Sequence, residues 1–401
     1  MRTTILARVS GRDGPGITAG LMTVLAEGGC TLYDVEQVVL RGRLSLSVLI
    51  AVPEGEPTIR DVLYYAWEKG LQAEFEVVDE APTPPPSRFA VSIIGAEVTP
   101  EAFGAVASAI AKSGGNIDRI ERLARYPVVS YELAVSGGEH ESMRTSLLAT
   151  ALGHDIDVAV QAEGITRRSK RLVVLDVDST LIQDEAIDLL AVEAGVGPEI
   201  AAITARAMDG EIDFADALEA RVSLLAGLPA EALARVKLRL RLTPGARTFV
   251  RTLKRMGMKI AIISGGFTVF TDPLRDELGI DHAFANELEI ADGRLTGRLA
   301  APPIDRARKA AILREVAFEE AIPLDQVVAI GDGANDLDML ATAGLGVAFN
   351  ARPVVRDAAA TSVSVPYLDA ILFLLGIRRD EVEAVSPEAS GGVPVAGLPP
   401  V

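Results

Sequence analysis

Short apolar runs, each followed by a polar loop, recur along the second half of the chain. Residues 172–175, 259–263 and 327–330 are almost wholly aliphatic and contain many β-branched side chains. Runs of this kind suit strands that are buried on both faces of a parallel sheet. Between them, apolar positions recur at helical spacing, as in residues 186–196 and 309–317. The alternation predicts an α/β fold with a parallel sheet.

The segment from about 185 to 240 interrupts this alternation. It follows the first predicted strand, its apolar residues recur at helical spacing, and it carries no strand signal. We therefore expect a helical insertion between the first and second strands of the sheet. Further on, Asp292-Gly293 between two strand-like runs predicts a hairpin. From residue 379 to 401 Pro, Gly, Ser and Glu dominate, which predicts a disordered tail.

The first half of the chain follows a different pattern, in the order β-α-β-β-α-β. The predicted strands are 4–10, 35–39, 44–52 and 73–78, and the predicted helices start at Ile17 and Ile59. The pattern recurs at an offset of about 84 to 86 residues, which indicates an internal repeat. The four prolines within residues 81–87 predict a stiff linker between the two copies.

Composition narrows the function classes. Lys and Arg number 39 against 56 Asp and Glu, a net charge of −17, so nucleic acid and anionic membrane surfaces are disfavoured as partners. No uncharged run reaches the roughly eighteen residues of a membrane helix. The start of the chain lacks a signal-peptide core, and Cys30 is the only cysteine. We expect a cytoplasmic protein that acts on a small molecule.

Chemically active residues follow the apolar runs of the second half. Asp176 and Asp178 follow the first, Ser264 and Gly265 the second, and Lys309 lies before the third. The third is followed by Asp332, Asn335 and Asp336. Ligands of open α/β sheets bind outside the carboxyl ends of the strands, so these residues are expected to meet. Each alone has an ordinary alternative: a strand-ending Asx turn, a surface lysine or a helix N-cap.

Together, and in this order, these residues resemble the haloacid dehalogenase superfamily, with its D-x-D-x-T, Ser or Thr, Lys and G-D-x-x-N-D motifs. The resemblance covers about 171–376. It implies a Rossmannoid parallel sheet with a helical cap and Mg²⁺-dependent phosphoryl transfer. The roles it implies are Asp176 as nucleophile, Asp178 as acid and base, Ser264, Gly265, Lys309 and Asn335 as phosphate ligands, Asp176, Asp332 and the Asp178 carbonyl as metal ligands, and Asp336 as a residue that orients Lys309 or a metal-bound water.

The predicted cap carries residues that suggest a substrate. Glu185, Met208, Phe214 and Arg221 resemble the phosphoserine phosphatase branch of the superfamily. That resemblance implies that Glu185 holds the substrate ammonium and Arg221 its carboxylate, with Met208 and Phe214 as an apolar wall. A zwitterionic amino acid does need one anion and one cation, and Arg grips carboxylates bidentately. The alternative is an internal Glu–Arg pair on a solvated helical lid.

The repeated modules resemble ACT domains, small ferredoxin-like βαββαβ units that often bind amino acids. The first keeps the string Gly11-x-Asp13-x-Pro15-Gly16-Ile17, whose turn lets a ligand approach amides at a helix start. An amino-acid effector is therefore expected at Asp13 and Gly16. The second module has Glu97-Val-Thr-Pro100 in that place, so its site is in question. Pairing of such modules implies a homodimer.

The expected organisation is a first ACT domain at 1–80, an ACT-like domain at 87–166, a phosphatase domain at 170–378 with its cap at about 185–240, and the tail. The expected activity is hydrolysis of O-phosphoserine to serine and phosphate through an aspartyl phosphate, the last step of serine biosynthesis. Two alternatives remain open. One is a phosphatase for another small phosphorylated metabolite, and the other is an amino-acid sensor whose phosphatase domain is idle.

Overall fold

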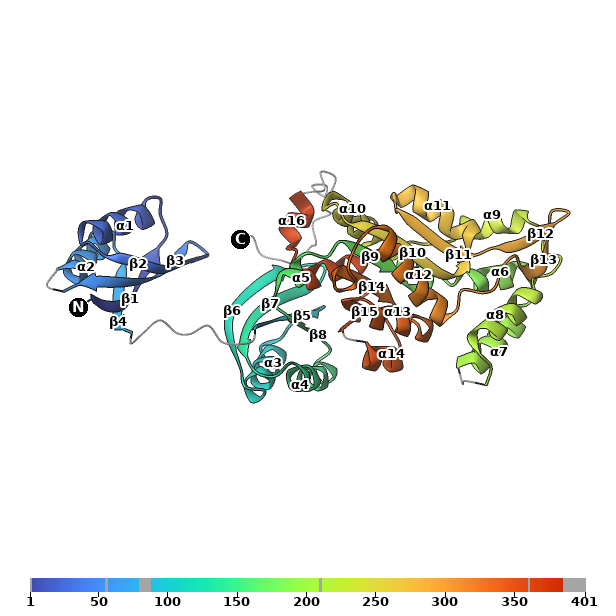
Figure 1. The fold of residues 1–401 in the computed structure, drawn as a ribbon, viewed down its shortest axis with the longest axis horizontal. Coiled ribbons are helices and arrows are strands. Elements are labelled where there is room, and N and C mark those ends of the chain that lie inside the picture. Colours follow the sequence, from blue (N-terminus) through green and yellow to red (C-terminus); the bar gives the residue numbers. More distant parts are fainter. Residues whose placement is uncertain (1, 55–56, 79–87, 209–210, 360, 385–401) are drawn as a thin grey trace. The chain divides into compact units, whose positions relative to one another are not determined.

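The computed structural model describes residues 2–54, 57–78, 88–208, 211–359 and 361–384. The chain divides into two compact units, 1–84 and 85–401, each of which is described by itself. The predicted proline linker falls within 79–87, outside the described residues. Figure 1 labels most of the elements named below.

The first unit is an antiparallel sheet with two helices. Its elements are β1 (Arg2–Arg12), α1 (Ile17–Glu27), β2 (Thr31–Leu40), β3 (Arg43–Pro53), α2 (Thr58–Glu68) and β4 (Gln72–Val77). The strand order is β2-β3-β1-β4, with every pair antiparallel. Side chains of β3 alternate between the core and solvent, and Leu46 and Val48 pack fully buried against Leu21 and Val62 of the helices. The predicted element order is confirmed, although β2 is longer than its apolar residues suggested.

The second unit opens with the repeat of this module. Its elements are β5 (Arg88–Gly95), α3 (Pro100–Lys112), β6 (Gly115–Ala124), β7 (Val129–Gly137), α4 (His140–Leu152) and β8 (Asp157–Ala162). The strand order β6-β7-β5-β8 corresponds to that of the first module. Thr99 caps α3 by accepting a hydrogen bond from the Ala102 amide, and Pro100 opens the helix.

A six-stranded parallel sheet follows, as expected for the α/β fold. Its order is β11 (His282–Asn286), β10 (Lys259–Phe267), β9 (Leu172–Leu175), β14 (Val327–Gly331), β15 (Leu345–Phe349) and β16 (Thr361–Val363). Side chains of β9 alternate between two cores: Val173 and Leu175 pack in one, Leu172 and Val174 in the other. All four are fully buried, which explains the unbroken apolar run. The predicted fold class is confirmed.

Helices contribute side chains to both cores. The core that contains Val173 includes side chains of α10 (Ala246–Arg255) and α15 (Ile371–Leu374), and the core that contains Val174 includes α12 (Arg306–Glu319) and α13 (Leu337–Thr342). Two further helices are α11 (Thr268–Leu278) and α14 (Pro353–Ala358).

The insertion after β9 is a separate helical layer with its own core, the cap. It contains α6 (Ala186–Ala194), α7 (Gly197–Met208), α8 (Phe214–Ser223) and α9 (Glu231–Lys237). The predicted hairpin forms as β12 (Leu288–Ala291) and β13 (Arg294–Leu299), turning at Asp292 and Gly293. Leu295 of β13 is buried in the core of the cap, so the hairpin completes this layer.

The second module and the parallel sheet share one hydrophobic core. Ile94, Leu123, Ala124, Val128 and Ala159 belong to the same buried cluster as the side chains of α10 and α15. Two hydrogen bonds cross the same seam, from the Gln161 Nε2 to the Leu374 carbonyl (2.8 Å) and from the Ser364 amide to Asp157 Oδ2 (2.6 Å).

The expectation of a disordered tail from residue 379 is wrong for its first part. Residues Arg379–Ala384 form α16, whose Val382 is only 2% exposed within the shared core. The polar composition of the segment concealed this single apolar anchor. Residues 385–401 lie outside the described residues.

Candidate active site

The three central strands end side by side at the predicted site. In the parallel register Leu175 of β9 lies opposite Ile262 of β10 and Ile330 of β14. The chain therefore delivers Asp176, Ser264 and Asp332 to one edge of the sheet, where the loops of α/β folds bind ligands. The sequence spacing alone already implied this convergence, because each residue lies within two positions of the end of its apolar run.

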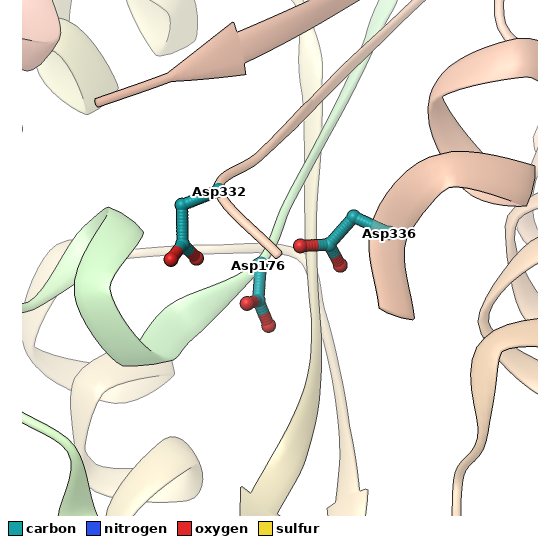
Figure 2. A group of neighbouring side chains, drawn as sticks. All are labelled: Asp176, Asp332 and Asp336. Atoms are coloured by element: carbon teal, nitrogen blue, oxygen red, sulfur yellow. The ribbon is translucent and has the colours of Figure 1, made fainter. Parts of the chain in front are cut away.

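Three carboxylates gather at this edge (Figure 2). Asp176, Asp332 and Asp336 each offer an oxygen, and these oxygens lie within 4.8 Å of one another. Asp176 and Asp336 are buried, while Asp332 is partly open to solvent and accepts a hydrogen bond from the Thr180 hydroxyl at 3.3 Å. Like charges this close repel unless a cation or a proton neutralises them.

Lys309 of α12 supplies one positive charge. Its Nζ, in a side chain with no exposed surface, donates to Asp176 Oδ1 and to Asp336 Oδ1, each at 2.7 Å. Burial alone would lower the pKa of Lys309, but the two carboxylates outweigh that effect and hold the pKa above its usual value. The amine is therefore charged, and Asp336 orients it toward Asp176.

One lysine does not compensate the whole group. Burial, and then the charge of Asp336, raise the pKa of Asp176 well above its usual range. The same two causes raise the pKa of Asp332 to about 7. A hard divalent cation bound by these oxygens would remove the repulsion, and an all-oxygen donor set is the kind that Mg²⁺ prefers. The residues present thus fit a metal ion.

Asp178 is held at a distance from this group by its own partners. Its carboxylate accepts a hydrogen bond from the Ala186 amide at 2.8 Å and from the Ser264 hydroxyl at 3.0 Å. Burial raises the pKa of Asp178, although these hydrogen bonds lower it in part. Ser179 bends the loop with a positive φ of 56°, and Thr243 fastens it by donating to the Thr180 carbonyl at 2.7 Å.

The end of β10, from Ser264 to Gly266, approaches the cap closely. A Cβ on Gly265 would lie 2.9 Å from the Phe214 ring, so only glycine allows that ring to contact the loop. Asn286 fixes the position of Gly265. Its side-chain amide donates to the Gly265 carbonyl and its side-chain oxygen accepts from the Ile304 amide, both at 2.8 Å. The sequence did not single out Asn286 as a site residue. Its position as the last residue of β11 is the only feature of the sequence that points to such a role.

Glu185 and Arg221 belong to the cap side of the site. Crowding by protein atoms, and then the charge of Asp178, raise the pKa of Glu185 to about 7, although part of its surface is open to solvent. Burial lowers the pKa of Arg221, and the charge of Glu185 opposes that shift, so the two groups are neighbours. The expected alternative, a direct Glu–Arg pair, is absent: Glu185 accepts instead from the Ser179 hydroxyl at 2.8 Å, and the Arg221 Nε donates to the Ala217 carbonyl at 3.2 Å.

Two predicted substrate residues are less well placed. Asn335 lies in a short 3₁₀ turn (Ala334–Asp336) in the loop that carries Asp332, where its oxygen abuts Gly333. Met208 ends α7, and its side chain lies outside the described part of the structure. The roles of both stay predictions.

The predicted effector turn lies in the first unit. Gly16 caps α1 with φ 87°, a conformation that favours glycine, and a Cβ there would meet no atom within 4 Å. The Asp13 amide donates to the Gly42 carbonyl at 2.9 Å, while its side chain is exposed. The turn is thus open, and its role as an effector site stays a prediction.

Comparison with known proteins agrees with this geometry. Residues 173–341 match the family model of haloacid dehalogenase-like hydrolases, and residues 3–76 and 87–161 each match an ACT domain model. Within the described residues, none of the helices combines the length and the apolar character needed to cross a membrane.

Relatives match along nearly the whole chain. Phosphoserine phosphatase of Streptomyces coelicolor is 53% identical over 95% of this chain and 94% of its own. Phosphoserine phosphatase SerB2 of Mycobacterium tuberculosis is 47% identical over 96% and 95%. The unliganded crystal structure of a probable phosphoserine phosphatase from Vibrio cholerae is 36% identical, with a TM-score of 0.56 over 75% of this chain and 88% of that one. The chain belongs to the family of phosphoserine phosphatases that carry a haloacid dehalogenase-like hydrolase domain after two ACT domains.

Proposed function

We propose that the protein hydrolyses O-phosphoserine to serine and phosphate with the help of Mg²⁺. The observation that carries this proposal is the buried Lys309, held at 2.7 Å from both Asp176 and Asp336 at the end of the central strand. A fixed cation beside a carboxylate nucleophile is what phosphoryl transfer requires.

In the first displacement a carboxylate oxygen of Asp176 attacks phosphorus. The bond from phosphorus to the serine oxygen breaks, and that oxygen takes a proton from Asp178. Burial raises the pKa of Asp178, which is the direction that suits a proton donor. Lys309, Ser264 and the Gly265 amide would bind the equatorial oxygens, with Asn335 beside them.

In the second displacement water attacks the phosphorus of the aspartyl phosphate. Asp178 accepts the proton from that water, and the bond from phosphorus to Asp176 breaks. Phosphate leaves and both carboxyl groups return to their starting state. The metal ligands would be Asp176, Asp332 and the Asp178 carbonyl, and a bound ion would supply positive charge beside the phosphoryl group. Asp336, bound to Lys309, would act through that lysine.

The substrate would lie between Glu185 and Arg221. These side chains do not pair with each other. Glu185 would therefore bind the ammonium group of the substrate, and Arg221 its carboxylate. Phe214 would close the apolar side of the pocket, where it already contacts the Gly265 loop, and Met208 would join it. A phosphate ester without the amino-acid group would use only the phosphate half of the site.

A direct test is phosphate release from L-phosphoserine with Mg²⁺ and with EDTA. We expect turnover only with the metal, and none in Asp176→Asn, because an amide does not attack phosphorus. Asp276→Asn, on the exposed surface of α11, is the matched control and should keep full activity. Turnover by Asp176→Asn would refute the nucleophile, and turnover in EDTA would refute the metal.

For the whole protein we propose a cytoplasmic homodimer that catalyses the last step of serine biosynthesis. The presence of a single cysteine supports a reducing compartment. The domain division proposed is 1–80, 87–166 and 170–378, with the cap at about 185–240.

We also propose that the open turn at Asp13 and Gly16 binds an amino acid. Serine should then inhibit at saturating phosphoserine, where competition at the active site is suppressed. Asp13→Asn and a protein that begins at residue 88 should lose this inhibition, whereas Asp34→Asn, also exposed on the first unit, should keep it. Unchanged inhibition in the shortened protein would exclude the first module as the sensor. A sedimentation measurement showing a monomer would refute the dimer.

A further inference from the structure

A cavity lies within the second unit, at the seam between the second module and the parallel-sheet domain. Its volume is about 340 Å³, and its walls are the end of β6 with the following loop on one side and α16 on the other. Its charged lining residues are four arginines, Arg122, Arg125, Arg378 and Arg379, and two acids, Asp380 and Glu383. The active-site residues described above do not line it.

The four guanidinium groups are not equally engaged. Arg379 is committed to Asp369 at 2.7 Å and Glu383 at 3.1 Å, and it lies over the ring of Tyr126 at 5.2 Å. Arg378 has only longer ion pairs, 3.4 Å to Asp380, 3.6 Å to Glu121 and 3.9 Å to Glu381.

Arg122 and Arg125 differ from both. Among the described residues neither has an ion pair or a side-chain hydrogen bond, although the chain carries a net charge of −17. Within the described part of the chain, several exposed arginines outside the cavity, such as Arg41 and Arg43, also have no ion pair, so what distinguishes Arg122 and Arg125 is that both line one cavity. Both side chains line the cavity and are exposed, so their unengaged donors can bind a ligand there.

The local backbone explains why both arginines line one cavity. The pairing of β6 with β7 shifts register between Arg122 and Ala124, and such irregularities redirect side chains. Leu123 and Ala124, between the two arginines, turn inward and are 4% and 2% exposed. They form part of the shared core, as does Val382 of α16. Both walls of the cavity therefore pack into the same hydrophobic core, which fixes the backbone that carries the arginines.

We propose that this cavity binds a small anion of the phosphate or phosphate-monoester class. Guanidinium groups match phosphate oxygens with two parallel hydrogen bonds, and two arginines without internal partners fit one doubly charged group. The volume is at the low end of the usual range for small-molecule sites, roughly 300 to 1,000 Å³. This volume suits a phosphate on a short carbon skeleton. The carbon skeleton would lie beside Tyr126, Leu123 and Ala124, which also line the cavity.

The test is calorimetric titration of the full-length protein with inorganic phosphate, up to about 10 mM at low salt. We expect two binding events, one at the active site and one at the seam. In the double variant Arg122→Gln with Arg125→Gln, phosphate affinity at the seam should fall at least tenfold. Binding at the active site should be unchanged. Turnover of phosphoserine by this variant without added phosphate should be unchanged.

The matched control is Arg255→Gln with Arg298→Gln, which removes the same charge from two exposed arginines outside the cavity. It should keep both events. Melting temperatures verify that both double variants are folded. A single event in the natural protein, or equal loss in both double variants, would overturn the proposal.

Repeating the titration with glycerol 2-phosphate distinguishes free phosphate from a monoester as the preferred anion. This arm uses the Asp176→Asn protein, so that the ester is not hydrolysed. The active-site event is read separately in every arm, so failure of the seam site leaves the proposed phosphatase activity as a distinct result.

Discussion

Replacing Lys309 by methionine should destabilise the protein strongly as well as inactivate it. The Lys309 side chain has no exposed surface and neutralises two carboxylates that are themselves buried. Methionine keeps most of the volume and flexibility of lysine, so the change removes the charge with little loss of packing. Asp176 and Asp336 would then face each other without a cation from the chain.

The magnitude follows from the geometry. At an effective dielectric constant of about 20, opposite unit charges 2.7 Å apart attract by about 6 kcal/mol. Dehydration of the buried charges offsets much of this attraction, and breaking a buried ion pair by removing one partner typically costs about 3–5 kcal/mol. We therefore expect Lys309→Met to lower the free energy of unfolding by about 3–5 kcal/mol.

The assay is unfolding in urea at pH 7.5, followed by circular dichroism, with EDTA present so that a bound cation does not replace the missing charge. Lys237→Met, on the exposed surface of α9, is the control and should change stability by less than about 0.5 kcal/mol. Adding Asp336→Asn to Lys309→Met should recover about 1–3 kcal/mol, because it removes one of the uncompensated charges.

Phosphoserine turnover should stay absent in that double variant, since the phosphoryl group still lacks its lysine. Two results would refute the reasoning. One is a Lys309→Met protein as stable as the Lys237→Met control. The other is a double variant whose loss of stability equals the sum of the two single losses, because additivity would mean that Lys309 and Asp336 do not interact.

Three further predictions concern other parts of the structure. Asp178→Asn should lower kcat for phosphoserine by about 10²- to 10⁴-fold, and an unchanged kcat would exclude it as the acid. Arg221→Ala should raise KM for phosphoserine about 10- to 100-fold, which corresponds to the loss of one charged hydrogen bond. Hydrolysis of p-nitrophenyl phosphate should be nearly unchanged. Equal losses on both substrates would mean that Arg221 serves the chemistry or the stability of the lid. Burial raises the pKa of Asp157 to about 6, so the folded protein binds this proton more tightly than the unfolded chain, and its stability falls as pH rises from about 4 to 6. Asp157→Asn should remove this fall, worth about 3 kcal/mol, so its gain in melting temperature should be larger at pH 7.5 than at pH 4.5; an equal gain at both would contradict the assignment.

The sheet and its site were predictable because both depend on local order along the chain. A fully buried strand such as β9 must be apolar throughout, and a parallel sheet must present the ends of its strands together. The positions of Asp176, Ser264 and Asp332 follow from these two requirements alone.

Residues that act through distant partners were not predictable in this way. Arg167, within the basic run 167–171 that suggests an exposed linker, is 5% exposed and pairs with Glu132 and Glu163. Asn286 supports a loop 21 residues away in sequence. In both cases the partner is brought near only by the folded chain, so nothing adjacent in the sequence reveals the contact.

The core shared by the second module and the parallel-sheet domain has a consequence for synthesis of the chain. Leu123, Val128 and Ala159 are made early, whereas Ile371 and Val382, which pack in the same cluster, are made near the end. Domains generally fold in the order in which they are synthesised. The second module must therefore wait, with an apolar surface uncovered, while more than half of the protein is still being translated. A nascent chain arrested before β16 should bind chaperones through this surface. A fragment beginning at residue 169 should aggregate, because it exposes the apolar surface of the parallel-sheet domain that the second module normally covers.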